Sequence, residues 1–198
     1  MKKLKLKNDN VSEGKDLFLE ALDNVVNKQQ FTDVCIEKLQ HLPIEFYDYI
    51  GIILNHLGFK TRVTREGDVN LRFDATIIDD EDSIPIEIKS PREDREINIK
   101  AIRQALENKI VLLSRHFYKT KSETSSLAIA FEYPPKRSDV YELITDIKNA
   151  FGFNIGIINI IDLLSLLYDV KKSSTVLDLN YFNTFNGMFC YEKALIKR

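Results

Sequence analysis

The sequence has little of several features that mark particular classes of protein. Only two of its 198 residues are cysteine, and Cys35 and Cys190 lie too far apart for metal-ligand spacing or a disulfide scaffold. The three histidines, His41, His56 and His116, form no spaced cluster, which gives no support to a histidine metal site or a histidine general base. The seven glycines are scattered rather than gathered in a phosphate-binding loop, so nucleotide hydrolysis is not expected.

The chain also lacks a long apolar run and an excess of positive charge. No segment is apolar for long enough to span a membrane, and no apolar stretch follows the lysine-rich start, Met1–Lys7, as it would in a signal peptide. We therefore expect a soluble, cytoplasmic protein with reduced thiols. The formal net charge is -2, so any contact with nucleic acid must come from local basic patches, another domain or a partner subunit.

The periodicity of apolar residues predicts helices and strands in a definite order. Residues 1–11 are interpreted as a flexible basic leader, residues 12–42 as N-terminal helices capped by Ser12 and Thr32, and residues 43–190 as the core domain. In the core we expect a helix over 43–58, strands over 59–65, 70–78 and 84–89, a helix over 97–117, a strand over 127–131, a helix over 138–152, a strand over 154–159 and a helix from 161 onward. Helical crossovers favour parallel pairing, whereas the early hairpin is antiparallel, so the order predicts an α/β fold with a mixed central sheet flanked by helices.

The hairpin over residues 70–89 gathers the most informative charged residues. Side chains alternate along a strand, so Glu87 and Lys89 share one face, and Asp74 lies on the polar face of the preceding strand. Two carboxylates beside each other suit Mg²⁺ or Mn²⁺, and a lysine next to such an ion can orient water. This is the equipment of a metal-dependent phosphodiester nuclease. The alternative reading is the solvated charged face of a half-buried sheet.

The pattern resembles the PD-(D/E)xK nuclease superfamily, whose fold is restriction-endonuclease-like. Asp74 is followed by twelve residues and then by Glu87-Ile88-Lys89, with a helix before and a helix after. Phe73 stands where the name of the motif has proline, at a position that varies in the superfamily, and its side chain is expected to point into the core.

The C-terminal part of the chain resembles one particular group within this superfamily. Three segments are similar to the end of the FokI-type cleavage domain of type IIS restriction endonucleases. They are residues 154–158 with the Leu-rich helix that follows, residues 175–178 and residues 185–189. The resemblance covers most of residues 40–190, but its motifs are short and degenerate.

The resemblance implies roles for the matching residues. Asp74 would bridge Mg²⁺, for which Mn²⁺ would substitute, with Glu87 as the second carboxylate and the Ile88 carbonyl as an adjacent ligand. Lys89 would position the attacking water and stabilise charge on the phosphorane. Glu45 would be an outer or second-metal ligand, although a carboxylate at the start of a helix also simply complements the helix dipole.

Further residues are candidates for contact with the DNA backbone. Gln104 lies in the helix after the Glu-x-Lys strand, where superfamily members often place a polar contact to the phosphate; its alternative is an exposed helix residue. The basic candidates are Arg92, Arg95, Lys100 and Arg103. For each of these, the alternative is an ordinary solvated loop or helix face.

These residues together predict a metal-dependent endonuclease that hydrolyses double-stranded DNA. Nothing in the sequence resembles a base-reading module, and one site per chain cuts one strand, so we expect a homodimer on DNA or a heterodimer with a specificity subunit. Two alternatives remain. One is a non-catalytic PD-(D/E)xK-like domain that binds DNA or a protein, and the other is a structure-selective junction resolvase or repair nuclease.

Overall fold

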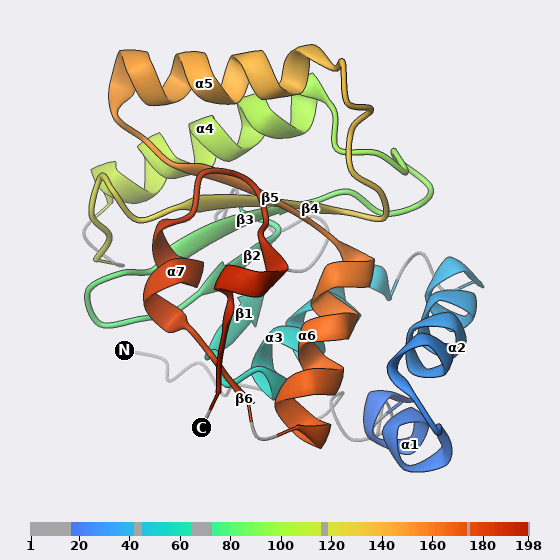
Figure 1. The fold of residues 1–198 in the computed structure, drawn as a ribbon. Coiled ribbons are helices and arrows are strands. Elements are labelled where there is room, and N and C mark those ends of the chain that lie inside the picture. The colour runs from blue at the N-terminus through green and yellow to red at the C-terminus, as the bar shows by residue number, and fades with distance from the viewer. Residues whose placement is uncertain (1–16, 42–44, 65–72, 116–118, 174, 198) are drawn as a thin grey trace, which may run out of the picture.

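The computed structural model describes residues 17–41, 45–64, 73–115, 119–173 and 175–197. Figure 1 shows a central sheet covered by helices on both faces. The leader expected over residues 1–11 and the helix start expected at Pro43 lie outside the described residues, as does the cap expected at Ser12. No helix in the described part of the chain combines the length and apolar character needed to cross a membrane.

The elements have the following bounds. The helices are α1 (Leu17–Asn24), α2 (Lys28–His41), α3 (Phe46–His56), α4 (Ile99–Ser114), α5 (Asp139–Phe151), α6 (Ile160–Lys172) and α7 (Leu179–Thr184), with a 3₁₀ turn, η1, at Tyr191–Lys193. The main sheet contains β1 (Thr61–Val63), β2 (Ala75–Ile77), β3 (Ile84–Ile88), β4 (Ser126–Ala130), β5 (Ile155–Asn159) and β7 (Gly187–Met188). A separate pair is formed by β6 (Thr175–Leu177) and β8 (Leu195–Lys197).

Within the described residues, the main sheet has six strands in the order β1-β2-β3-β4-β5-β7. β1, β2 and β3 pair antiparallel, whereas β3, β4, β5 and β7 pair parallel. The predicted mixed α/β sheet is therefore confirmed. The switch occurs at β3, because a short turn joins it to β2 while the α4 crossover joins it to β4.

Local side-chain chemistry sets the ends of several helices. The carbonyl oxygen of the Asn98 side chain accepts from the backbone N–H of Ala101 at 3.0 Å and caps α4. Ser138 caps α5, since its hydroxyl accepts from the N–H of Val140 at 3.3 Å. α5 ends at Gly152, whose φ of 73° is in the left-handed region that glycine adopts readily.

Some expected boundaries were wrong. α2 begins at Lys28 rather than after Thr32, and the Thr32 hydroxyl donates to the Lys28 carbonyl at 3.0 Å from inside the helix. The side chain of Asn27 instead accepts from the N–H of Gln30 at the helix start. α1 ends at Asn24 rather than continuing into α2, and Val26 in the connection is 87% exposed. The edge strand β7 was not predicted, because two residues carry no periodicity.

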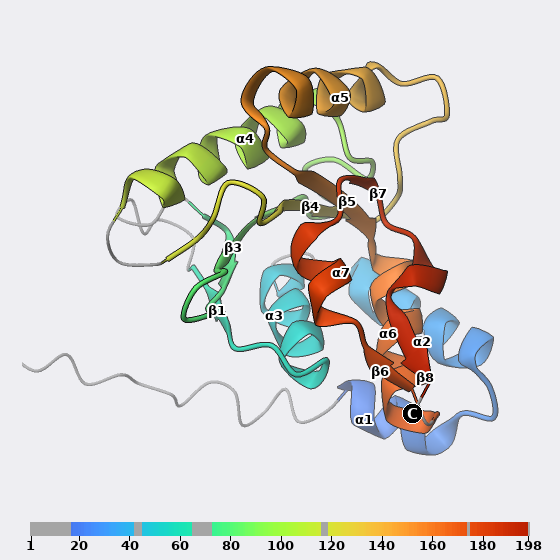
Figure 2. The ribbon, with the colours of Figure 1, turned by 60° about the vertical axis from the view of Figure 1, so that its left-hand side comes forward.

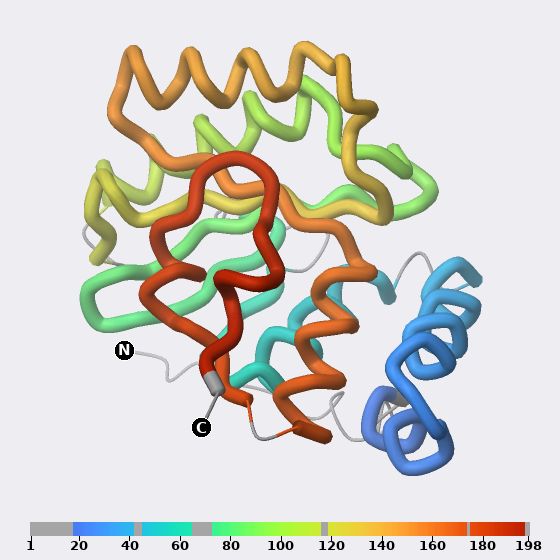
Figure 3. Tube along the Cα trace, in the orientation of Figure 1, coloured from blue at the N-terminus to red at the C-terminus, as the bar shows by residue number. Residues whose placement is uncertain are grey.

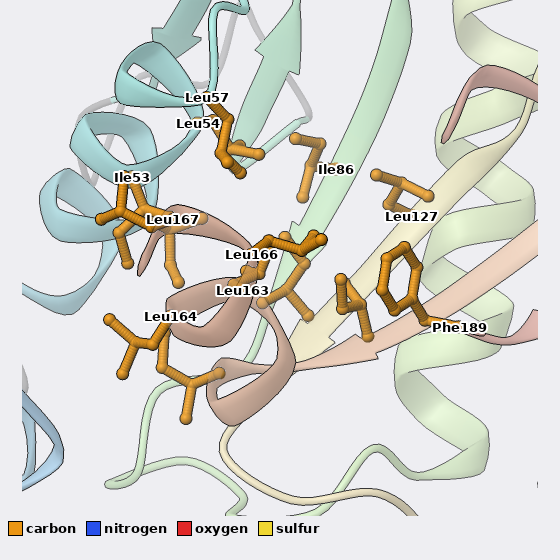
Figure 4. Close-up of a cluster of buried hydrophobic side chains, with 14 of the residues drawn as sticks. Ile53, Leu54, Leu57, Ile86, Leu127, Leu163, Leu164, Leu166, Leu167 and Phe189 are labelled. Carbon is orange, nitrogen blue, oxygen red and sulfur yellow. The ribbon is translucent and has the colours of Figure 1, made fainter. Parts of the chain in front are cut away.

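Two apolar layers enclose the sheet. On one face, α3 and α6 pack against it through a cluster that includes Ile53, Leu127 and Leu166 (Figure 4). α4 and α5 cover the other face (Figures 1 and 3). The cluster there includes Ala128 and Ala130 of β4 and Ile155 and Ile157 of β5. Figure 2 shows the C-terminal segment passing beside α6 to the β6–β8 pair.

Gly156 in β5 is required by close packing. A Cβ at this position would lie 2.5 Å from two ring carbons of Phe185 and 2.9 Å from Leu127 Cδ2. Gly156→Ala is expected to lower the free energy of unfolding by about 1–3 kcal/mol, since overpacking shifts neighbouring side chains. Urea denaturation measures this value. Adding Phe185→Leu should recover part of the loss in a double-mutant cycle, and additive effects would contradict the proposed clash.

Candidate active site

The carboxylates of Asp74 and Glu87 come from neighbouring strands. β2 pairs with β3 so that Ala75 lies opposite Ile86. Continuing this register by one residue places Asp74 opposite Glu87, and residues opposite each other in an antiparallel pair point to the same face. Asp74 is anchored there because its Oδ2 accepts from the N–H of Ile88 at 2.8 Å.

Lys89 completes a charged group with these two carboxylates. Its Nζ lies 2.8 Å from Glu87 Oε1, and the two side chains are only 5% and 4% exposed. The N–H of Lys89 donates to the Ile129 carbonyl at 2.8 Å, which extends the β3–β4 pairing beyond Ile88. The structure therefore brings Asp74, Glu87 and Lys89 together on one face, as the alternation of the strands predicts.

α4 covers this face of the sheet and contributes a further polar group. Asn108 is buried, and its Nδ2 donates to Glu87 Oε2 at 3.2 Å. Gln104 lies four residues earlier and thus on the same side of α4. Because a crossover helix runs antiparallel to the strand before it, Gln104 lies toward the Lys89 end of β3. Its Oε1 is buried and has no hydrogen-bond partner among the described residues.

Burial and charge repulsion alter the acid–base properties of the cluster. Burial, together with the nearby Glu87 carboxylate, raises the pKa of Asp74 to about 7, although the Ile88 N–H acts in the opposite direction. Burial alone would lower the pKa of Lys89, but its hydrogen bond to Glu87 and the surrounding carboxylates raise it. A cation beside Asp74 would relieve the repulsion between the two acids.

A third carboxylate, that of Glu93, lies near the cluster. Its Oε2 accepts from the Tyr47 hydroxyl of α3 at 2.6 Å and from Ser90 N and Oγ at 3.1 and 3.2 Å. Electrostatically it stabilises the charged form of Lys89 and opposes ionisation of Asp74. Burial would raise the pKa of Glu93, but these hydrogen bonds and Lys89 lower it.

The other predicted residues are placed less directly. Glu45 is exposed at the N-cap of α3, and no contact of the described residues joins it to Asp74 or Glu87; its charge acts on Tyr49. Arg95 is engaged within the chain, since its Nε and Nη2 donate to Glu132 Oε1 at 2.9 and 2.7 Å and its guanidinium lies over the Phe131 ring. Exposed positions are occupied by Arg92, Lys100 and Arg103.

The donor set fits a hard divalent ion in part. Within the described ranges, no three Asp, Glu, His or Cys side chains form a group that could hold a metal ion. Asp74 and Glu87 supply two carboxylates, and Mg²⁺ is commonly bound by one or two carboxylates together with water and substrate phosphate. Asp74, Glu87 and the Ile88 carbonyl are thus the groups that would hold the ion.

Sequence reasoning missed Asn108 and the pair formed by Tyr47 and Glu93. The signal for Asn108 is its polarity at a helical position between the apolar residues Ala105 and Leu112 of α4. Glu93 follows Ser90 by three residues in the Ser-x-x-Glu pattern, in which the glutamate accepts from the serine N–H. Tyr47 carries no comparable signal, since an aromatic residue at a helical position usually indicates core.

Comparison with known proteins supports the fold. No protein-family model and no curated protein sequence matches this chain. A solved structure of the restriction endonuclease FokI aligns with 87% of this chain, with a TM-score of 0.51 and 13% sequence identity. The alignment covers 30% of that chain, so the present chain spans less than a third of its length. The chain has a restriction-endonuclease-like fold, as predicted from its motifs.

Proposed function

We propose that this chain is a divalent-metal-dependent DNA endonuclease, acting as the cleavage domain or subunit of a type IIS-like restriction enzyme. One observation carries the proposal: Asp74 and Glu87 lie opposite each other beside Lys89, and the pKa of Asp74 is raised to about 7 by burial and by Glu87. A carboxylic acid with a strongly raised pKa beside a lysine is more typical of a reactive site than of a solvated sheet face.

The residues of the cluster divide the work of phosphodiester hydrolysis. A bound Mg²⁺ would polarise a phosphoryl oxygen and lower the pKa of a water. Lys89 orients the attacking water and donates to the oxygen on which charge develops as the new P–O bond forms and the leaving oxygen departs. Gln104, whose buried Oε1 has no hydrogen-bond partner among the described residues, would donate its amide N–H to a phosphate.

Asn108 and Lys89 together fix the orientation of the Glu87 carboxylate. Glu87 accepts from Lys89 on one oxygen and from Asn108 on the other, which fixes the plane of its carboxylate. Glu45 and the backbone-contact residues Arg92, Lys100 and Arg103 keep their proposed roles as outer groups, and Arg95 would first have to leave Glu132. Double-strand cleavage then requires a homodimer on DNA or a heterodimer with a specificity subunit.

A non-catalytic binding module is the second candidate. The burial of Glu87 and Lys89 favours it, because their ion pair already satisfies both charges and leaves about 5% of either side chain accessible. In that case the cluster would stabilise the sheet, and DNA or a protein would bind elsewhere. A junction-selective or repair nuclease would use the same residues on branched DNA.

Nicking of supercoiled plasmid distinguishes these functions. The wild-type chain is expected to nick DNA with Mg²⁺ or Mn²⁺ and to lose this activity in EDTA. Glu87→Gln, purified in the same way, controls for contaminating nucleases and should be inactive. Metal-independent nicking, or equal nicking by both proteins, would contradict the proposal, and a preference for branched substrates would favour the junction or repair enzyme.

A further inference from the structure

The turn that follows β3 is tied to α3 through one carboxylate. Ser90 begins the turn directly after Lys89, and its carbonyl accepts from the N–H groups of Glu93 and Asp94 at 3.0 and 3.2 Å. The Glu93 side chain returns to the N–H and hydroxyl of Ser90. This reciprocal bonding closes the turn immediately beside the lysine.

Tyr47 adds a connection from a distant part of the sequence. Its hydroxyl donates to the same oxygen of Glu93 at 2.6 Å, across 46 positions of sequence. Its ring packs against the core beneath the sheet, so the hydroxyl is held by the body of the domain. An exposed glutamate that only covered the surface would not need three donors on one oxygen, since water serves a solvated carboxylate equally well.

Lys89 is the charged residue next to the turn that Glu93 and Tyr47 hold. Its ammonium is ion-paired with Glu87 and also interacts electrostatically with Glu93 and Asp74, so Glu93 supplies a further negative charge. The Lys89 backbone is held by Ile129 on one side and leads into the closed turn on the other. Glu93 therefore acts on Lys89 in two ways, through the turn that follows it and through its own negative charge.

We propose that Glu93 and Tyr47 are positioning residues for Lys89, which hold its ammonium group beside the carboxylate pair by closing the turn at residues 90–94 and providing a second counter-charge. The consequence for catalysis rests on the proposed nuclease function, but the effect on Lys89 does not. The two can therefore be tested separately.

Chemical acetylation of the intact chain tests the effect on Lys89. In wild type, Lys89 is expected to react slowly because it is buried and ion-paired. Glu93→Gln and Tyr47→Phe should each raise its acetylation rate about tenfold, as expected when a hydrogen bond to a charged group is lost. Mass spectrometry after a short pulse gives the rate for each lysine.

Lys109 is a matched internal control. It is also fully buried, but it is held at the far end of α4 by the hydroxyl of Thr120 and the carbonyl of Lys121. Its rate should not change in either variant. Glu142→Gln and Tyr141→Phe, both on α5, should leave Lys89 protected. An equal rise at Lys89 and Lys109 would indicate general loosening and overturn the inference, as would an unchanged rate at Lys89.

Cleavage kinetics provide the second measurement. If wild type nicks plasmid, Glu93→Gln and Tyr47→Phe should lower kcat about 10- to 100-fold and leave the KM for DNA unchanged, because misplacement of a reacting group affects the chemical step. A change in KM alone would overturn the positioning role. If wild type does not nick plasmid but Lys89 becomes reactive in the variants, the proposed function fails while the positioning of Lys89 stands.

Discussion

Lys89→Ala is expected to lower the rate of Mg²⁺-dependent cleavage by about 100- to 1,000-fold or more. The ammonium is the donor available to an oxygen that gains charge in the transition state, and removing one such donor typically has an effect of this size. Plasmid nicking under single-turnover conditions measures the loss. Lys171→Ala, an exposed substitution near the end of α6, serves as the control and should cleave at the wild-type rate.

The same variant should bind Mn²⁺ at least as tightly as wild type. Without Lys89, Glu87 is a buried carboxylate that lacks its counter-ion, and such a change destabilises a fold by several kcal/mol, about 3–5. Mn²⁺ can restore the missing charge, so it should raise the Tm of Lys89→Ala more than that of wild type. Wild-type cleavage by the variant, or loss of Mn²⁺ binding, would contradict the assigned role of Lys89.

Asp74→Asn is expected to abolish cleavage and to stabilise the free protein at neutral pH. The pKa of Asp74 is about 7 in the folded state, against about 3.9 in an unfolded chain, so the folded protein binds more protons between these values. Wild type therefore loses stability as the pH rises from about 4 to 7. Asn cannot titrate and can still accept from Ile88 N–H.

The advantage of Asp74→Asn should grow through this pH window and become constant above it. Each pKa unit corresponds to about 1.4 kcal/mol, so the difference at pH 8 should be on the order of a few kcal/mol. Urea denaturation from pH 4 to pH 8 measures it. Adding Mg²⁺ at pH 8 should stabilise wild type and leave the variant unchanged. A pH-independent difference would show that Asp74 has an ordinary pKa.

Sequence alone was sufficient to bring together the three central groups because they are close in the chain. Alternation along two strands and a short turn fix the relative positions of Asp74, Glu87 and Lys89, and these constraints are local. Phe73 is 2% exposed, in agreement with its predicted place in the core. The mixed sheet follows in the same way, from the lengths of the connections between strands.

The surrounding groups could not be predicted because their positions depend on how helices pack on the sheet. Glu45 and Tyr47 differ by two positions, or about 200° around a helix, and only the docking of α3 decides which one faces the site. The tyrosine does, through Glu93. Asn108 likewise reaches Glu87 only when α4 is laid along β3.

The reversal of strand direction at β3 has a consequence for the order in which the chain can fold. Both carboxylates belong to an antiparallel hairpin with a short connection between its strands. Closing a short loop costs little conformational entropy, so the two charged groups can meet early in folding. The parallel strands β4, β5 and β7 must wait for much longer segments to close. Like charges thus approach each other before α4 brings Asn108 to the Glu87 carboxylate, so this half of the sheet forms around a repulsive contact that later packing relieves.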